Sequence, residues 1–188
     1  MVEIITYQEK WLEEFQKIAQ EIRVGLGNLA IRIDHIGSTS VLGLAAKDII
    51  DIQITVAVLD DELNFAMEVL GYKQPEGIWR DHCPQTVEFI ETEWEKWFFR
   101  PPSGQRKTNT HVRVQGRANQ RYPLLFRDYL RAHPATTGAY AELKRRLAAN
   151  LKNIEMYPEV KDPAVDLIYF AAEDWANLTK WQPGSSDA

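Results

Sequence analysis

The chain has 188 residues, of which 45% are apolar and 26% are charged, and its formal net charge is −5. This length and composition are typical of one globular domain, and the acidic balance argues against a coat for nucleic acid or membrane surfaces. The single cysteine, Cys83, excludes an internal disulfide and suits a reducing compartment. The N-terminus has no secretory pattern and no apolar run is long enough to span a bilayer. We therefore expect a cytoplasmic protein without a membrane partner.

The first third of the chain predicts a helix followed by two strands. Thr6 and Glu9 have the spacing of a capping box, and apolar residues at spacings of three and four predict a helix from there to Gly27. Alternating apolar and polar residues at 31–34 predict a half-buried strand. The β-branched run at 49–58 predicts a central strand.

The middle of the chain is less regular. Acidic residues at 60–62 predict the first turn of a helix that ends before Gly71. Between residues 72 and 95 prolines and glycines interrupt every pattern, although 87–90 fits a short strand. Residues 97–99 and 111–114 predict two more strands, joined by a polar loop.

The last third predicts helices. Apolar stripes recur from residue 120 onward, and Asp162-Pro163 has the pattern of an N-cap and a first-turn proline for the final helix. We expect the polar tail at 183–188 to be disordered. The order of elements predicts an α/β or α+β domain with a helical C-terminal third, formed by residues 1–182.

A polar turn follows the first predicted strand and precedes a carboxylate on the second. The turn is Gly37-Ser38-Thr39-Ser40, and Asp51 lies within the central strand. Glycine permits close backbone approach, and the Ser and Thr hydroxyls add hydrogen-bond donors to the backbone N–H groups. A carboxylate on the adjacent strand can hold a metal ion. This combination favours a site for phosphoryl or nucleotidyl transfer.

The same residues resemble a known family. Residues 35–47 followed by 50–52 resemble the signature of the GrpB (UPF0157) family, and residues 109–114, 126–134 and 140–144 resemble its later motifs. The resemblance implies one GrpB-like domain with the fold of the nucleotidyltransferase superfamily, a small mixed sheet flanked by helices. In some bacteria a GrpB-like domain follows dephospho-coenzyme A kinase, which points to nucleotide-like or coenzyme-A-related ligands.

The resemblance also implies a Mg²⁺ site. Active nucleotidyltransferases hold Mg²⁺ between two carboxylates at positions i and i+2 of a strand, which share one face. Here these positions are Asp51 and Gln53, and glutamine keeps an oxygen but loses the charge. Glu88 is the candidate for a third carboxylate if residues 87–90 lie beside this strand. We expect Asp51 to be catalytic, with Gln53 and Glu88 as further ligands of Mg²⁺.

A basic segment supplies the remaining candidates. Between Arg100 and Arg131 there are eight Lys or Arg residues and one acidic residue. Asn109, His111 and Arg113 share one strand face by the period of two, so we expect them to line a pocket that faces the Gly37 turn. Arginine suits bidentate phosphate recognition, and histidine can act as a general base, a metal ligand or a phosphate contact.

Lys47 is a further candidate for a phosphate contact. A solvated polar face for the basic segment and an ordinary surface position for this lysine are the structural alternatives.

Three functions are compatible with this pattern. The first is a Mg²⁺-dependent nucleotidyl or phosphoryl transferase that acts on a nucleotide or phosphorylated small molecule. The second is a non-catalytic module that keeps the phosphate-binding turn and binds a phosphorylated or carboxylated small molecule. Gln53 favours the second, because the usual second carboxylate is missing. Nucleic-acid binding through the basic segment is the weakest of the three, given the overall acidity.

Overall fold

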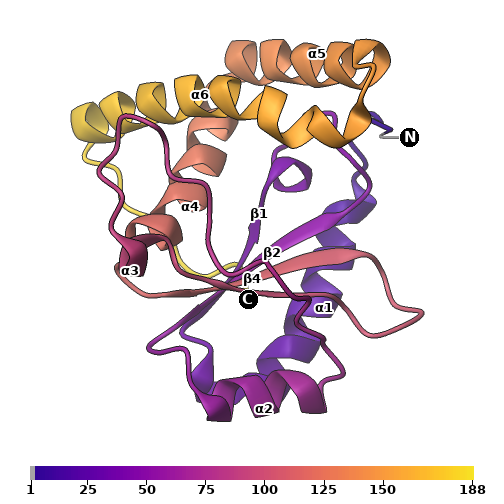
Figure 1. Ribbon diagram of the computed structural model, residues 1–188, viewed down its shortest axis with the longest axis vertical. Helices are drawn as coiled ribbons and strands as arrows, with labels where there is room; N and C mark the ends of the chain where they lie inside the picture. Colours follow the sequence, from indigo (N-terminus) through magenta and orange to yellow (C-terminus); the bar gives the residue numbers. More distant parts are fainter. Residues whose placement is uncertain (1–2) are drawn as a thin grey trace.

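The computed structural model describes residues 3–188 and shows a four-stranded sheet between two groups of helices (Figure 1). The strands, in spatial order, are β1 (Arg32–Ile36), β2 (Ile50–Val56), β4 (Thr108–Val114) and β3 (Trp97–Phe99). The helices are α1 (Lys10–Leu26), α2 (Asp61–Val69), α3 (Glu91–Trp94), α4 (Ala118–Ala132), α5 (Pro134–Asn150) and α6 (Tyr157–Thr179). The central strands β2 and β4 run parallel and both edge pairs are antiparallel, which confirms the predicted mixed α/β fold.

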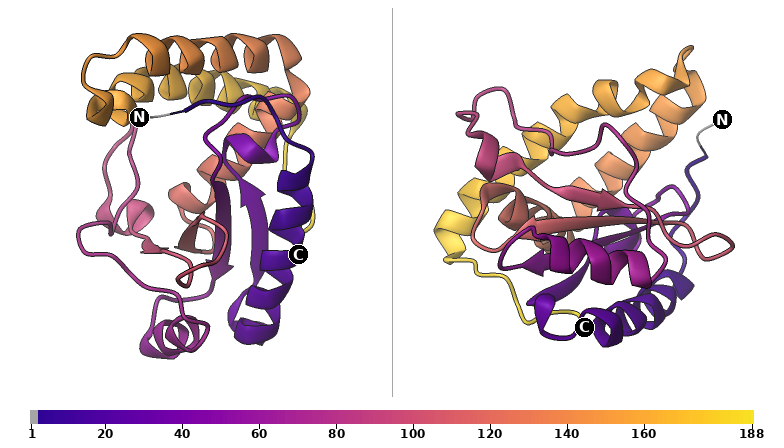
Figure 2. Two further views of the ribbon diagram at one scale, coloured as in Figure 1. Left: turned by 90° about the vertical axis from the view of Figure 1, so that its right-hand side faces the viewer. Right: turned by 60° about the horizontal axis from the view of Figure 1, so that its bottom comes forward.

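One face of the sheet carries the main apolar core. Ile50, Ile52 and Ile54 alternate along β2 and are fully buried in one cluster with residues of α1 and α2. Trp11 and Phe15 on the buried stripe of α1 belong to the same cluster. These two helices lie together on one side of the sheet (Figure 2).

The opposite face is polar and lies under the C-terminal helices. Asp51 and Gln53 are register partners of Asn109 and His111, so these four side chains share the face that Ile52 and Ile54 do not occupy. Helices α4, α5 and α6 form a separate layer on this side (Figure 1). The fold therefore places the predicted site residues between the sheet and the helical third of the chain.

Two predicted helix starts are wrong. Helix α1 begins at Lys10, and its N-cap residue Glu9 makes no side-chain cap, so the capping box with Thr6 is absent. Helix α6 begins at Tyr157 and contains Pro163 in its interior. An earlier proline, Pro158, occupies the first turn, where proline's missing N–H costs nothing.

The predicted strand at 87–90 is also absent. Apart from the single turn of α3, residues 72–95 form an irregular segment. Isolated β-bridges connect Lys73 with Arg100 and Arg80 with Glu95. Glu88 is exposed in this segment and does not lie beside β2.

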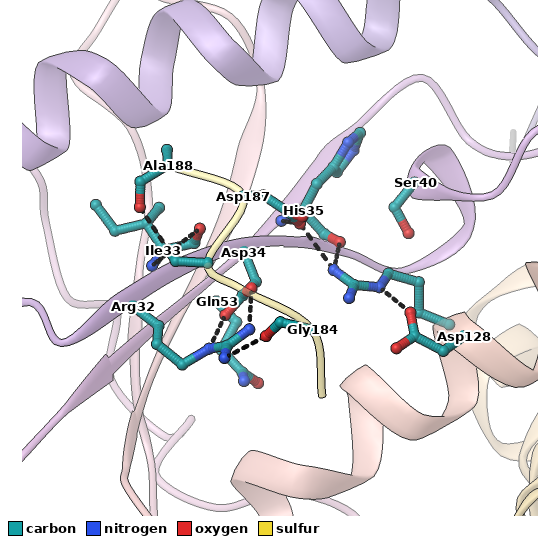
Figure 3. Close-up of polar contacts among 12 residues, drawn as sticks. Arg32, Ile33, Asp34, His35, Ser40, Gln53, Asp128, Gly184, Asp187 and Ala188 are labelled. Atoms are coloured by element: carbon teal, nitrogen blue, oxygen red, sulfur yellow. Dashed lines mark hydrogen bonds and ion pairs between the residues drawn. The ribbon is translucent and has the colours of Figure 1, made fainter. Parts of the chain in front are cut away.

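The C-terminal tail, for which we predicted disorder, lies along the free edge of β1 (Figure 3). The backbone N–H of Ala188 donates to the carbonyl oxygen of Ile33 (3.1 Å). The Asp187 carboxylate accepts from the backbone N–H of His35 (2.9 Å) and from the guanidinium of Arg127 (2.7 Å). An edge strand presents unpaired backbone groups, and the tail satisfies several of them, which explains why a short polar segment is held in place.

No helix among residues 3–188 has the length and apolar character needed to cross a bilayer.

Candidate functional site

The Gly37 turn packs directly against the Asp51 carboxylate. Gly37 has φ of +68°, and a Cβ at this position would lie 2.3 Å from Asp51 Oδ2. The turn continues as a short 3₁₀ segment, Ser38–Ser40. Only glycine permits both this backbone conformation and this approach. The sequence pattern is therefore explained by contact between the turn and the carboxylate.

A cavity of about 260 Å³ opens beside this contact. Ser38 and Thr39 of the turn, Lys47 from the following loop, Asp51 of β2 and Asn109 of β4 line one side of it. The structure thus brings together five residues that the sequence analysis assigned to one site.

The other side of the cavity comes from the C-terminal helices. Lys144 and Tyr140 of α5 and Lys161 and Tyr157 of α6 line it, and none of these four was predicted as a site residue. Lys144 was quoted only within a family motif. The available signal was its position four residues after Tyr140, on the stripe that α5 buries. We refer to the whole cavity as the lysine cavity.

The three lysines are held without full compensation of their charge. Lys144 is 3% exposed, its ammonium donates to Ser38 Oγ (2.9 Å), and it lies 4.7 Å from the ring centroid of Tyr140. The ammonium of Lys47 lies 4.5 Å from the ring centroid of Tyr157. Within the described part of the chain neither Lys144 nor Lys47 forms an ion pair, and Lys161 is 4.0 Å from its neighbour Asp162.

Burial disfavours the charged form of each of these lysines. Burial, assisted by the positive charge of Lys161, lowers the pKa of Lys144 to about 7, although Asp51 opposes the shift. Burial likewise lowers the pKa values of Lys47 and Lys161, again against the effect of Asp51. An anion bound among these ammonium groups would restore their charged forms. The cavity is therefore suited to negatively charged ligands.

Asp51 is the one carboxylate among the residues that line the lysine cavity. Its Oδ1 accepts a hydrogen bond from Asn109 Nδ2 (2.7 Å). Burial raises the pKa of this carboxyl, although the Asn109 hydrogen bond and the nearby cations oppose the shift.

Gln53 and Arg113 belong to a different cluster on the same face of the sheet. Gln53 Oε1 accepts from Arg113 Nη1 (2.7 Å), and its Nε2 donates to the carbonyl oxygen of Gln120 (3.0 Å). Arg113 also donates twice to the Asp81 carboxylate, at 2.8 Å each, and Lys96 donates to Asp81 at 2.6 Å. We call Gln53, Asp81, Lys96, His111 and Arg113 the buried ionic network.

In the buried ionic network both cations, Arg113 and Lys96, are paired with the one carboxylate of Asp81. Burial alone would raise the pKa of Asp81, but the charge and hydrogen bonds of Arg113 and the charge of Lys96 hold it well below the usual range. Burial, together with Arg113 and Lys96, lowers the pKa of His111 well below its usual value, and its Nδ1 lies 3.2 Å from Lys96 Nζ. Neither His111 nor Arg113 lines the lysine cavity, contrary to our expectation.

The remaining predicted residues have other positions. Ser40 Oγ donates to the Gly37 carbonyl (2.6 Å), and its own carbonyl accepts from Arg131, so it stabilises the turn from behind. Glu88 does not line the lysine cavity.

These positions bear on the expected Mg²⁺ site. Both ends of the Gln53 amide are engaged within the protein, and three lysines surround Asp51. Among residues 3–188 no group of three or more His, Cys, Asp or Glu side chains is arranged to hold a metal ion. A hard cation prefers several oxygen ligands with net negative charge. The donor set does not fit the two-carboxylate Mg²⁺ site that the resemblance implied.

Comparisons with known sequences identify relatives along the whole chain. A family model described as GrpB protein matches residues 1–170. UPF0157 protein YqkA of Bacillus subtilis is 35% identical over 190 residues, which cover 100% of this chain and 50% of that protein. A dephospho-CoA kinase of Mycolicibacterium paratuberculosis is 35% identical over 197 residues, which cover 97% of this chain and 48% of that protein. The chain thus spans about half the length of these curated relatives.

Solved structures give a consistent result. The crystal structure of the conserved protein GrpB from Enterococcus faecalis matches with a TM-score of 0.72 and 29% identity, over 92% of this chain and 99% of that one. Cid1 in complex with its short product ApU matches with a TM-score of 0.50 and 11% identity, over 77% of this chain and 43% of that one. The second likeness concerns the fold alone. The chain belongs to the GrpB protein family and has a nucleotidyltransferase-like fold.

Proposed function

We propose that the lysine cavity binds the phosphate groups of a nucleotide or a related phosphorylated small molecule, and that it does so without Mg²⁺. The observation that carries the proposal is that three partly or fully buried lysines line one cavity together with the Ser38–Thr39 turn, which Lys144 contacts, and that a single carboxylate lies among them. Phosphate oxygens accept hydrogen bonds from lysine ammonium groups and from Ser and Thr hydroxyls. Each ammonium that pairs with a phosphate regains the charge that burial disfavours.

The relatives support the ligand class. Several matched proteins are named dephospho-CoA kinase, and this chain corresponds to about half of each. Dephospho-coenzyme A is itself a nucleotide derivative, so it belongs in the ligand panel beside ATP and tripolyphosphate. The fold likeness to Cid1 is compatible with nucleotide binding but contributes no residue to the argument.

Mg²⁺-dependent transfer, the other function considered from the sequence, requires Asp51 as a metal ligand. In the metal-free proposal the same carboxylate has the opposite effect, because it repels a bound phosphate. Replacement of Asp51 by asparagine therefore separates the two functions by the sign of its effect.

The test is the melting temperature of the wild type, Asp51→Asn and Lys144→Met with each ligand, in EDTA and in Mg²⁺. A ligand that binds only the folded protein stabilises it by about 2.7 kcal/mol at one hundred times its Kd. We expect stabilisation in EDTA, an equal or larger shift in Asp51→Asn, and a smaller one in Lys144→Met. Lys17→Met, at an exposed position on α1, is the matched control for loss of one positive charge. A shift that requires Mg²⁺ and disappears in Asp51→Asn would establish the transferase-type site instead.

A further inference from the structure

A second cavity lies on the polar side of the sheet, beneath the irregular segment 72–95. Its volume is about 160 Å³, and its walls include Trp94 of α3, Tyr122 of α4 and Val165 of α6. Asp81 and His82 of the irregular segment also line it. We call this space the ring cavity.

A buried hydrogen-bond acceptor without a donor lies in its wall. Asn119 is 1% exposed, and its Nδ2 donates to Asp81 Oδ2 (3.1 Å) and to the carbonyl oxygen of Glu95 (2.8 Å). These two bonds fix the orientation of the amide, because a flipped amide would place its oxygen against two acceptors. Among residues 3–188 no donor reaches Asn119 Oδ1.

A second polar atom in the same wall is also unsatisfied. The Tyr122 hydroxyl is buried and has no hydrogen-bond partner among the residues that the structure describes. Leaving a buried polar group unpaired costs about 1–3 kcal/mol. Two such atoms in the wall of one cavity indicate that its occupant supplies hydrogen bonds.

The rest of the wall favours a flat ring. Trp94 is almost fully buried, and its ring meets that of Tyr122 at an interplanar angle of 73° and a centroid distance of 6.2 Å. Pro123 and Val165 add apolar surface. Aromatic and apolar walls with a few directed polar atoms are typical of sites for small organic ligands. Water could pair with the two polar atoms, but it would leave the apolar walls of the cavity exposed to solvent.

We propose that the ring cavity binds a planar heterocycle that carries N–H donors, the chemical class to which nucleobases belong. An N–H group of the ring donates to Asn119 Oδ1, and the Tyr122 hydroxyl pairs with a second polar atom of the ring. The aromatic walls contact its faces and edges.

The position of the ring cavity relates it to the lysine cavity. Asn109 lines the lysine cavity and Arg113 lines the ring cavity, four residues further along β4, which is about 13 Å for an extended strand. Helix α6 lines both, through Lys161 and Val165. This spacing is compatible with one nucleotide whose phosphates occupy the lysine cavity and whose base occupies the ring cavity, a step that rests on the proposed function.

The inference also assigns a role to the irregular segment. His82 pairs with Asp166 of α6 (2.9 Å), and Asp81 is held by Arg113 and Lys96. The segment thus forms a wall of the ring cavity that is anchored both to the sheet and to α6.

The experiment uses probes that separate the two cavities. Adenine and uracil test the ring cavity, their N-methylated counterparts without N–H donors are matched controls, and tripolyphosphate tests the lysine cavity. Binding is measured by ligand-observed NMR and by titration calorimetry on the wild type, Val165→Trp, Val165→Ile and Tyr122→Phe. The tryptophan variant fills the ring cavity, and the isoleucine variant adds one methylene at the same position.

We expect one or both bases to bind the wild type and Val165→Ile, with at least tenfold weaker binding of the methylated counterparts. We expect Val165→Trp to abolish base binding and to leave tripolyphosphate binding unchanged, which also shows that this variant is folded. Tyr122→Phe weakens base binding without lowering the melting temperature, because it removes an unpaired hydroxyl.

Two results would overturn the inference. One is the absence of base binding to the wild type, which would mean that the ring cavity holds water only. The other is base binding that survives Val165→Trp. Neither result affects the proposed function, which fails if phosphates do not bind or bind only with Mg²⁺ through Asp51. Conversely, base binding without tripolyphosphate binding would retain the ring cavity and reject the lysine cavity.

Discussion

The lysine cavity and the buried ionic network lie on the same face of the same sheet, yet they differ in how closely their charged groups are paired. In the network, Arg113 and Lys96 surround Asp81 with short hydrogen bonds, and each charge has a partner. In the cavity, three lysines share the environment of one carboxylate. Removal of one partner from a buried ion pair is strongly destabilising, and a buried charge without a partner reduces stability unless a ligand compensates it. This difference distinguishes a structural polar cluster from the proposed binding site.

We expect the largest effect on stability from removal of the carboxylate at the centre of the network. Asp81→Ala leaves the charges of Arg113 and Lys96 buried without their partner, so we expect a loss of about 3–5 kcal/mol in the free energy of unfolding. Urea denaturation measures it. Glu155→Ala, at an exposed position, is the control and should change stability by less than about 0.5 kcal/mol. A small effect of Asp81→Ala would mean that the network is solvated and not structural.

Disruption of the turn should have the next largest effect. Gly37→Ala places a methyl group against the Asp51 carboxylate at a backbone conformation with positive φ, and we expect destabilisation by about 1–3 kcal/mol. Gly43→Ala has a similar positive φ but meets no atom within 4 Å, so it isolates the cost of the backbone from that of the contact. Equal losses in the two variants would show that the approach to Asp51 is not the reason for Gly37.

Phosphate binding to the lysine cavity should depend on pH through Lys144. The pKa of Lys144 is about 7 in the free protein, and a bound phosphate favours its charged form. Below pH 7 the lysine is already protonated, so its contribution to affinity is at its maximum. Above pH 7 binding must take up a proton, and affinity should fall by up to about tenfold per pH unit. Calorimetric titration of tripolyphosphate between pH 6 and 9 measures this, and the dependence should flatten in Lys144→Met.

The lowered pKa of Lys144 also makes the stability of the ligand-free protein depend on pH. In the unfolded chain the lysine keeps its ordinary pKa of 10.5, so between about pH 7 and 10.5 the unfolded state binds more protons than the folded state. The contribution of Lys144 to stability therefore rises with pH across this window. A contribution that falls would contradict the lowered pKa.

Much of the fold follows from local patterns. The β-branched run in β2 and the acidic residues at the start of α2 predict those elements closely. In the structure Asp60 is the N-cap of α2 and accepts a hydrogen bond from the backbone N–H of Leu63 (3.0 Å). The sequence did not indicate that the C-terminal tail is held in place, because its contacts are with the free edge of β1, which is distant in sequence. The predicted start of α6 was wrong because Pro163 was assigned to the first turn, whereas Pro158 occupies that turn and Pro163 lies inside the helix.

The candidate site also contains residues that the sequence predicted and residues that it did not. The side formed by the Gly37 turn, Lys47, Asp51 and Asn109 was predictable, because turn and strand patterns are local. Lys144 and Lys161 were not, because they reach the cavity only through the packing of α5 and α6 over the sheet. Strand periodicity placed Arg113 on the correct face, but it carries no information on the partner that occupies it, Asp81.

The most direct test of the account is the free energy of unfolding of Lys144→Met and of the wild type at pH 7, each with and without saturating tripolyphosphate. Without ligand we predict that the variant is more stable, by about 1 kcal/mol, because it removes a buried, uncompensated charge. With ligand we predict the reverse order, because the variant binds phosphate at least tenfold more weakly, about 1.4 kcal/mol. A variant that is less stable than the wild type in both conditions by the same amount would show that Lys144 is structural and would contradict the assignment of the lysine cavity as a phosphate site.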